Sequence, residues 1–280
     1  MAKSARPRAY RPFVRVMAGG IVIAGSMACS LFVDLDGLNS GVDTDAALIE
    51  ASTTDGLADT SSDAINATDS NLGSDGSFDA GPLTPIEFVQ GSAVAFGSSD
   101  AGTMAITITA AQPGDTLIVA TVNDGTATAQ ITDDHGDLFT AVNGPYGAPH
   151  GVRDYIFAAI DVPGGAQLVT ISLTGSRPNY VELYVMEYSG IGSFDVGSAN
   201  LIDAAGTLES GTVMTKAAGE LLFAWSECQG TVGLGFGFTS RSTASGDLIE
   251  DKIAGAPGVY EATSTTNAAG EILLAAFGPK

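Results

Sequence analysis

The residues best suited to ligand chemistry lie on one predicted strand, Tyr180–Tyr188. Side chains two positions apart share a face of a strand, so three tyrosines and one carboxylate fall on the same side. Such a face offers flat rings to the C–H groups of a sugar and an acceptor to its hydroxyls, which makes it a candidate glycan-binding platform. Packing of the same rings beneath a loop or a second sheet is the structural alternative. The members of the platform are Tyr180, Glu182, Tyr184 and Tyr188.

The same strand resembles the active-site strand of jelly-roll glycosidases of the laminarinase type, which carries Glu-x-Asp-x-x-Glu. Here the segment reads Glu182-Leu183-Tyr184-Val185-Met186-Glu187. The resemblance implies a retaining hydrolase with Glu182 as nucleophile and Glu187 as acid/base. Tyr184 stands in place of the central Asp, and without a bulge the two glutamates face opposite sides of the strand. Hydrolysis is therefore the alternative, and we expect a protein that is not an enzyme.

Three further carboxylates, Asp133, Asp134 and Asp137, cluster at a predicted turn. Calcium binds several oxygen ligands from loops of this kind, so these residues are the candidate calcium ligands. The alternative is a solvated acidic turn whose side chains accept hydrogen bonds from nearby backbone amides. The chain holds 2 His and 2 Cys, too few for a metal site built on those residues. Calcium is accordingly the cofactor that the sequence suggests, if there is one.

The first 28 residues have the layout of a secretory signal peptide, with basic residues from Lys3 to Arg15 followed by an apolar stretch, Val16 to Met27. The segment Ser26-Met27-Ala28-Cys29 resembles the lipobox of bacterial lipoprotein precursors, although Leu is usual where Ser26 stands. The resemblance implies that Cys29 receives the lipid and that Ser30 after it favours the outer membrane. We expect a lipid-anchored protein of the bacterial outer membrane or cell surface. An ordinary signal peptide cut nearby is the alternative.

Residues 29–83 are predicted to form an acidic, disordered tether. Eleven acidic residues and no Lys or Arg lie between Asp34 and Asp79, among Ser, Thr, Gly and Ala. A segment with so few large apolar residues cannot offset the entropy of ordering, and its like charges repel one another. The sequence therefore predicts a spacer that lifts the following domain off a membrane.

From about Pro85 onward, short runs alternate between apolar and polar residues, as in Met104 to Thr109. This period of two, with turn signals such as Asn123-Asp124-Gly125, predicts strands. Gly114-Asp115-Thr116-Leu117 and Gly219-Glu220-Leu221-Leu222 both open apolar runs, which indicates a shared turn-to-strand pattern without a clean internal repeat. We predict that residues 84–280 form one all-β domain, an antiparallel β-sandwich of jelly-roll type, with an immunoglobulin-like sandwich as the alternative.

The second part of the chain also resembles β-sandwich modules carried by uncharacterised secreted bacterial proteins. The segments that carry this resemblance are Gly114 to Val119, Thr132 to Asp134, Glu187 to Ile191 and Gly237 to Thr239. It implies a fold and no known activity.

The balance of 32 acidic against 11 basic residues, a net charge of −21, argues against a nucleic-acid partner. The sequence thus predicts a lipid-anchored envelope protein presenting a non-catalytic binding module for a glycan or an envelope protein. A structural envelope protein without a small ligand is the further alternative.

Overall fold

The structure, a computed structural model, describes residues 83–97, 102–147, 150–175 and 178–280. All of them belong to one compact unit, Leu72–Lys280. The predicted signal peptide, the lipid-bearing Cys29 and the tether lie outside the described residues, and they stay predictions. Within the described ranges, no helix has the length and apolar character needed to cross a membrane.

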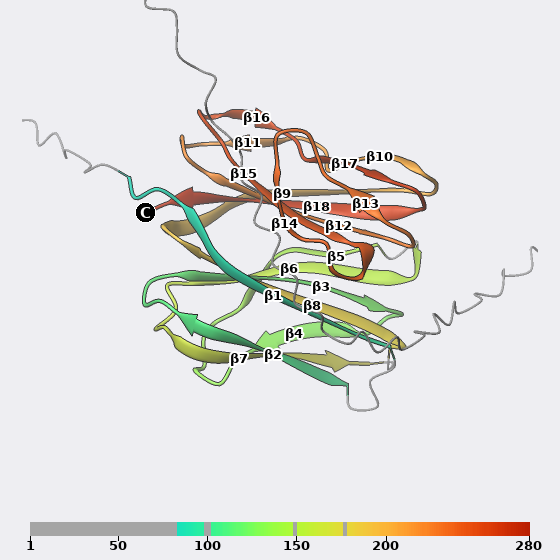
Figure 1. Cartoon of the computed structure of the whole chain (residues 1–280), viewed down its shortest axis with the longest axis horizontal. Coiled ribbons are helices and arrows are strands. Elements are labelled where there is room, and N and C mark those ends of the chain that lie inside the picture. Colours follow the sequence, from blue (N-terminus) through green and yellow to red (C-terminus); the bar gives the residue numbers. More distant parts are fainter. Residues whose placement is uncertain (1–82, 98–101, 148–149, 176–177) are drawn as a thin grey trace, which may run out of the picture. The chain divides into compact units, whose positions relative to one another are not determined.

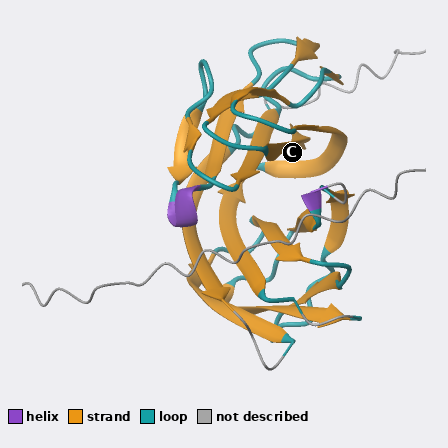
Figure 2. Ribbon diagram, turned by 90° about the vertical axis from the view of Figure 1, so that its right-hand side faces the viewer, coloured by secondary structure: helices purple, strands orange, loops and turns teal. Residues whose placement is uncertain are grey.

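The described chain is all-β and its strands pair in antiparallel fashion, which confirms the predicted fold class. Figure 2 shows strands throughout and little helix. The first eight strands are β1 (Glu87–Gly97), β2 (Thr103–Ala111), β3 (Thr116–Asp124), β4 (Thr128–Thr132), β5 (Thr140–Tyr146), β6 (Val152–Ile160), β7 (Gly165–Thr174) and β8 (Tyr180–Ser189). The remaining strands are β9 (Ile191–Ile202), β10 (Gly206–Glu209), β11 (Val213–Thr215), β12 (Leu221–Cys228), β13 (Val232–Gly233), β14 (Thr239–Ser242), β15 (Leu248–Ile253), β16 (Gly258–Tyr260), β17 (Thr263–Thr266) and β18 (Gly270–Pro279).

These strands lie in four layers rather than in the two layers of one sandwich (Figure 1). Two five-stranded sheets are central, with the orders β1-β8-β3-β6-β5 and β14-β15-β12-β18-β9. The sheet β2-β7-β4 covers the first central sheet, and the small sheets β10-β17-β13 and β11-β16 cover the second. The molecule is therefore a stack of two sandwiches that meet through their central sheets.

The two sandwiches share one strand order. We match β1 with β9, β8 with β18, β3 with β12, β6 with β15 and β5 with β14. The order β1-β8-β3-β6-β5 then becomes β9-β18-β12-β15-β14, which is the second central sheet read from β9. The outer order β2-β7-β4 likewise matches β10-β17-β13. The sequence indicated no clean repeat, so the structure reveals a repeat of topology that the residue pattern does not display.

The register of the strands repeats as well. Thr116 on β3 pairs with Ile160 and Tyr188, and Leu221 on β12 pairs with Ile253 and Phe277. Each strand of one set is therefore related to its equivalent by a constant shift of its own: 105 residues from β3 to β12, 93 from β6 to β15 and 89 from β8 to β18.

The turns that open β3 and β12 repeat too. Gly114 and Gly219 have positive φ angles of 89° and 78°. The N–H of Gly114 donates to the Val162 carbonyl at 2.9 Å, and that of Gly219 donates to the Ala254 carbonyl at 2.8 Å. The shared Gly-acid-apolar pattern is thus the sequence trace of two equivalent turns.

A single residue, Gly190, separates β8 from β9 and so joins the two sandwiches. Its φ is 78°, and a side-chain carbon there would lie 2.3 Å from the Pro85 carbonyl oxygen. Only glycine fits both conditions. The Gly190 carbonyl accepts the N–H of Lys280 at 2.8 Å, which ties the last strand to the junction.

The largest buried side chains fill the space between the two central sheets. Residues of β8 pack there against residues of β12 and β18, and the central core includes Tyr184, Tyr188, Phe223, Trp225 and Phe277. Each central sheet also packs against its outer cover, and each of these two contacts has a hydrophobic core of its own. Both faces of the central sheets are consequently covered, which explains why β3 and β12 are apolar on both sides.

Candidate metal centre

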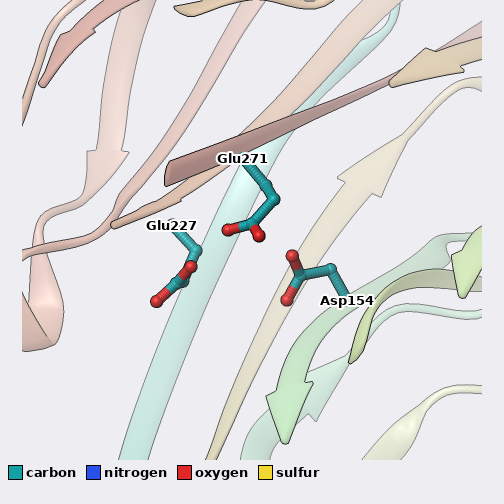
Figure 3. Close-up of side chains that lie close together, drawn as sticks. All are labelled: Asp154, Glu227 and Glu271. Atoms are coloured by element: carbon teal, nitrogen blue, oxygen red, sulfur yellow. The ribbon is translucent and has the colours of Figure 1, made fainter. Parts of the chain in front are cut away.

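Three carboxylates meet between the two central sheets. Asp154 extends from β6 of the first sandwich, while Glu227 on β12 and Glu271 on β18 come from the second (Figure 3). One oxygen from each lies within 4.8 Å of one from each of the others. The cluster therefore bridges the two sandwiches.

Strand register places these side chains together. Asp154 pairs with Val122 of β3, and Glu227 pairs with Glu271. Glu227 is two residues after Trp225, and Glu271 is two residues before Leu273, so both carboxyls point into the face that holds the central core.

The carboxyl of Asp154 is the least satisfied polar group of the cluster. Asp154 is 0% exposed, and neither of its oxygens has a hydrogen-bond partner in the described structure. Glu271 is 1% exposed, and its carboxyl contacts His150 and Glu227. Burying a carboxyl without partners is costly, so the cluster needs protons or a cation.

His150 connects the cluster to the surface. Its Nδ1 lies 2.5 Å from Glu271 Oε1 without the alignment of a hydrogen bond, and its Nε2 lies 3.0 Å from Asp203 Oδ1. The Asp203 side chain is 90% exposed and that of His150 is 11% exposed. Water can thus approach the cluster from this side.

Burial raises the pKa of each of the three carboxyls. Burial, followed by the charges of Glu227 and Glu182, raises the pKa of Asp154 well above its usual value. Burial, followed by the hydrogen bond and charge of Glu271, raises the pKa of Glu227 in the same direction. Burial also raises the pKa of Glu271 to about 7. A bound cation would have the opposite effect, because it favours the ionised form.

A second acidic pair, Glu182 and Asp247, lies in the same interface. Glu182 is 0% exposed, and the Tyr184 hydroxyl donates a hydrogen bond to it. The same hydroxyl lies 3.3 Å from Asp247 Oδ2, and the N–H of Cys228 donates to Asp247 Oδ1 at 3.3 Å. Burial, followed by the hydrogen bond and charge of Glu182, raises the pKa of Asp247 to about 11. The Tyr184 hydroxyl therefore contacts both carboxyls of this pair.

The donor set of Asp154, Glu227 and Glu271 consists of hard oxygen ligands, which suit Ca²⁺ or Mg²⁺. Calcium binds oxygens at about 2.3–2.6 Å, so two ligands on opposite sides of the ion are up to about 5 Å apart. The spacing of the three carboxyls meets that requirement. Calcium also accepts irregular geometry and water ligands, so it suits three carboxyls from two sandwiches better than Mg²⁺ does.

The predicted tyrosine platform is wrong. Tyr184 and Tyr188 are each 1% exposed in the central core, and Tyr180 is half-buried. The Tyr188 hydroxyl donates to Asp251 at 2.7 Å. Because β8 lies inside a central sheet that is covered on both faces, its tyrosines and Glu182 pack under a second sheet, which is the structural alternative.

Glu182 and Glu187, the residues of the hydrolase alternative, do not form a catalytic pair. Glu182 faces the central core, whereas Glu187 faces the outer sheet β2-β7-β4 and accepts hydrogen bonds from Gln90 Nε2 at 2.6 Å and the Gln112 N–H at 2.9 Å. The two carboxyls lie on opposite faces of the sheet, so they cannot act on one glycosidic bond.

At the predicted calcium turn, Asp133 and Asp134 accept hydrogen bonds from backbone amides, which is the alternative interpretation. Asp133 Oδ1 accepts the N–H groups of His135, Gly136 and Asp137 at 2.8–3.2 Å, and Asp134 Oδ1 accepts the Leu168 N–H at 2.8 Å. Burial, followed by the neighbouring Asp133, raises the pKa of Asp137 to about 6. Of the described residues, the group with the spacing of metal ligands is Asp154, Glu227 and Glu271 rather than these three.

Sequence reasoning missed Asp154, Glu227 and Glu271. One signal was available, because Glu227 continues the alternation of Phe223 and Trp225 and so puts an acid on an apolar face. Comparison with protein-family models, curated protein sequences and solved structures finds no match. The function must therefore be argued from the site itself.

Proposed function

We propose that this chain is a lipid-anchored cell-envelope protein whose stacked sandwiches form a non-catalytic binding or interaction module locked by one Ca²⁺ ion. The lipobox-like segment ending in Cys29 supports the anchor, and the acidic stretch of residues 29–83 supports a spacer. The ligand of the module is a glycan or another envelope protein. A bacterial outer membrane or cell surface is the location that these features favour.

The main support for a bound cation is the environment of the Asp154 carboxyl. Its carboxyl is wholly buried, lacks hydrogen-bond partners and faces Glu227 and Glu271 across the interface between sandwiches. A divalent ion would supply the missing partner to all three carboxyls at once. Because the ligands come from both sandwiches, the ion would also fasten one sandwich to the other.

The non-catalytic assignment is supported by the placement of the acidic groups. The glutamates of the glycosidase-like segment lie on opposite faces of β8, and the acidic cluster lies between two sheets. A substrate chain would have to separate the sandwiches to reach that cluster. An ion of atomic size needs no such opening.

The test is calorimetric titration of the full chain with Ca²⁺. We expect wild type to bind one ion, Asp154→Asn to lose binding, and Asp133→Asn to bind as wild type does. The Asp133 variant is a matched control, since it makes the same change at a carboxyl whose Oδ1 accepts hydrogen bonds from backbone N–H groups. No binding by wild type, or binding that Asp154→Asn leaves intact, would show the proposed ion to be wrong.

The binding role needs its own measurement. A glycan array probed with the full chain, and cross-linking to other envelope proteins, distinguish the two ligand classes. Negative results in both would favour a structural envelope protein without a small ligand, and they would leave the proposed calcium site unaffected.

A further inference from the structure

The acidic cluster repeats with the sandwiches. In the first sandwich, Val122 on β3 pairs with Asp154 on one side and Glu182 on the other. In the second sandwich, Glu227 on β12 pairs with Glu271. The pairing of β12 with β15 ends at Ser226 and Leu248, and the next residues beyond that pair are Glu227 and Asp247. Asp154 is thus equivalent to Asp247, Glu182 to Glu271, and Val122 to Glu227.

The contacts between these residues cross from one sandwich to the other. Asp154 of the first sandwich meets Glu271 of the second, and Asp247 of the second meets Glu182 of the first. Each equivalent Asp therefore meets the Glu of the opposite sandwich. This reciprocity is the mark of an interface with two-fold character, in which every contact occurs twice.

The two copies of this contact differ in the residues that lie beside the Asp–Glu pair. Glu227 supplies a third carboxylate beside Asp154 and Glu271, whereas the equivalent Val122 is apolar and 0% exposed. At the second place the Tyr184 hydroxyl contacts both carboxyls instead. One oxygen, Glu182 Oε1, is left there without a partner.

We infer that the interface contains two equivalent cation positions, and that the residue at 122 or 227 decides which one binds Ca²⁺. Glu227 completes the position at Asp154 and Glu271, and Val122 leaves the position at Asp247 and Glu182 one ligand short. The inference rests on the proposed function, because it requires that the first position binds calcium.

The physical basis is the number of negative ligands. Calcium affinity rises with the count of carboxylates around the ion. Three carboxylates present more negative charge to one ion than two do, and at the second place the Tyr184 hydroxyl already contacts both carboxyls. We therefore expect the Val-to-Glu difference to separate a position that binds a cation from one that does not.

The test exchanges the two residues and counts bound Ca²⁺ by equilibrium dialysis of the full chain. Glu227→Val gives the second sandwich the residue that the first sandwich has at the equivalent position, Val122. We expect this variant to bind no Ca²⁺. Val122→Glu should bind two ions, and the double exchange should bind one. Val122→Gln is the matched control, because it has the size of Glu without its charge and should bind one.

The outcomes separate this inference from the proposed function. Wild type that binds no calcium overturns the proposed ion. Wild type that binds one ion while Glu227→Val still binds one overturns the inference alone, as does a folded Val122→Glu protein that binds one. Should Val122→Glu fail to fold, as judged by circular dichroism, the result with Glu227→Val decides.

Discussion

Replacing Asp154 by Asn separates the cost of a buried carboxyl from the gain of a bound ion. Asn keeps the shape of the side chain and removes the negative charge that an ion needs. In EDTA the wild-type carboxyl has no hydrogen-bond partners, and its burial raises the pKa of Asp154, which opposes ionisation. We therefore expect Asp154→Asn to be at least as stable as wild type in EDTA.

With calcium the two proteins should differ. An ion that binds only the folded state adds about 2.7 kcal/mol to the free energy of unfolding when its free concentration is about 100 times Kd. For a domain of about 150–250 residues, each kcal/mol moves Tm by roughly 2–4 °C. Wild type should then gain about 5–11 °C in Tm, and Asp154→Asn should gain nothing.

Thermal unfolding of the full chain, followed by calorimetry with Ca²⁺ and with EDTA, measures both quantities. The Asp133→Asn control should follow wild type in both buffers. Two results would refute the reasoning: an equal calcium shift in Asp154→Asn and wild type, or a variant that is less stable than wild type in EDTA. The second would mean that the carboxyl contributes through the protein rather than through an ion.

Three further predictions concern pH, the buried tyrosines and the anchor. In EDTA, the free energy of unfolding should fall between about pH 5 and about pH 8. The pKa of Glu271 is about 7 in the folded state against the usual 4.5. The stabilisation that is present below pH 4.5 is therefore lost as the pH rises through 7. Urea unfolding at the two pH values measures this, and a midpoint that rises with pH contradicts it. Tyr188→Phe should cost about 1–3 kcal/mol in the same assay, because it removes the hydroxyl that donates to buried Asp251; unchanged stability would contradict the assigned hydrogen bond. Cys29→Ala should move the protein from the detergent phase to the aqueous phase in phase partitioning, and an unchanged distribution would exclude lipidation of Cys29.

The strands were predictable from sequence, but their grouping was not. Alternation and turn residues give the positions of strands such as β2 and β7, and the unbroken apolar run of β3 correctly predicts a strand covered on both faces. A period of two tells which residues share a face, without telling which sheet a strand joins. One sandwich and two stacked sandwiches therefore give the same local pattern.

The site was hidden for a related reason. Acidic residues and tyrosines are usually exposed, so Tyr184 and Tyr188 were expected to face solvent. The second central sheet buries that face, and no short segment of the sequence records the contact. Strand register brings Glu227 beside Glu271, but Asp154 lies in the other central sheet, and only the packing of the two sheets brings it to them.

The shared strand order has an evolutionary consequence. Duplication and fusion of a gene for one sandwich would give this chain, with Gly190 as the point of fusion between copies that once associated as a dimer. In such a dimer, positions 122 and 227 would have been the same residue, and the interface would have carried both extra carboxylates or neither. Such a fusion would allow one copy to change alone, which the unequal residues Val122 and Glu227 would require.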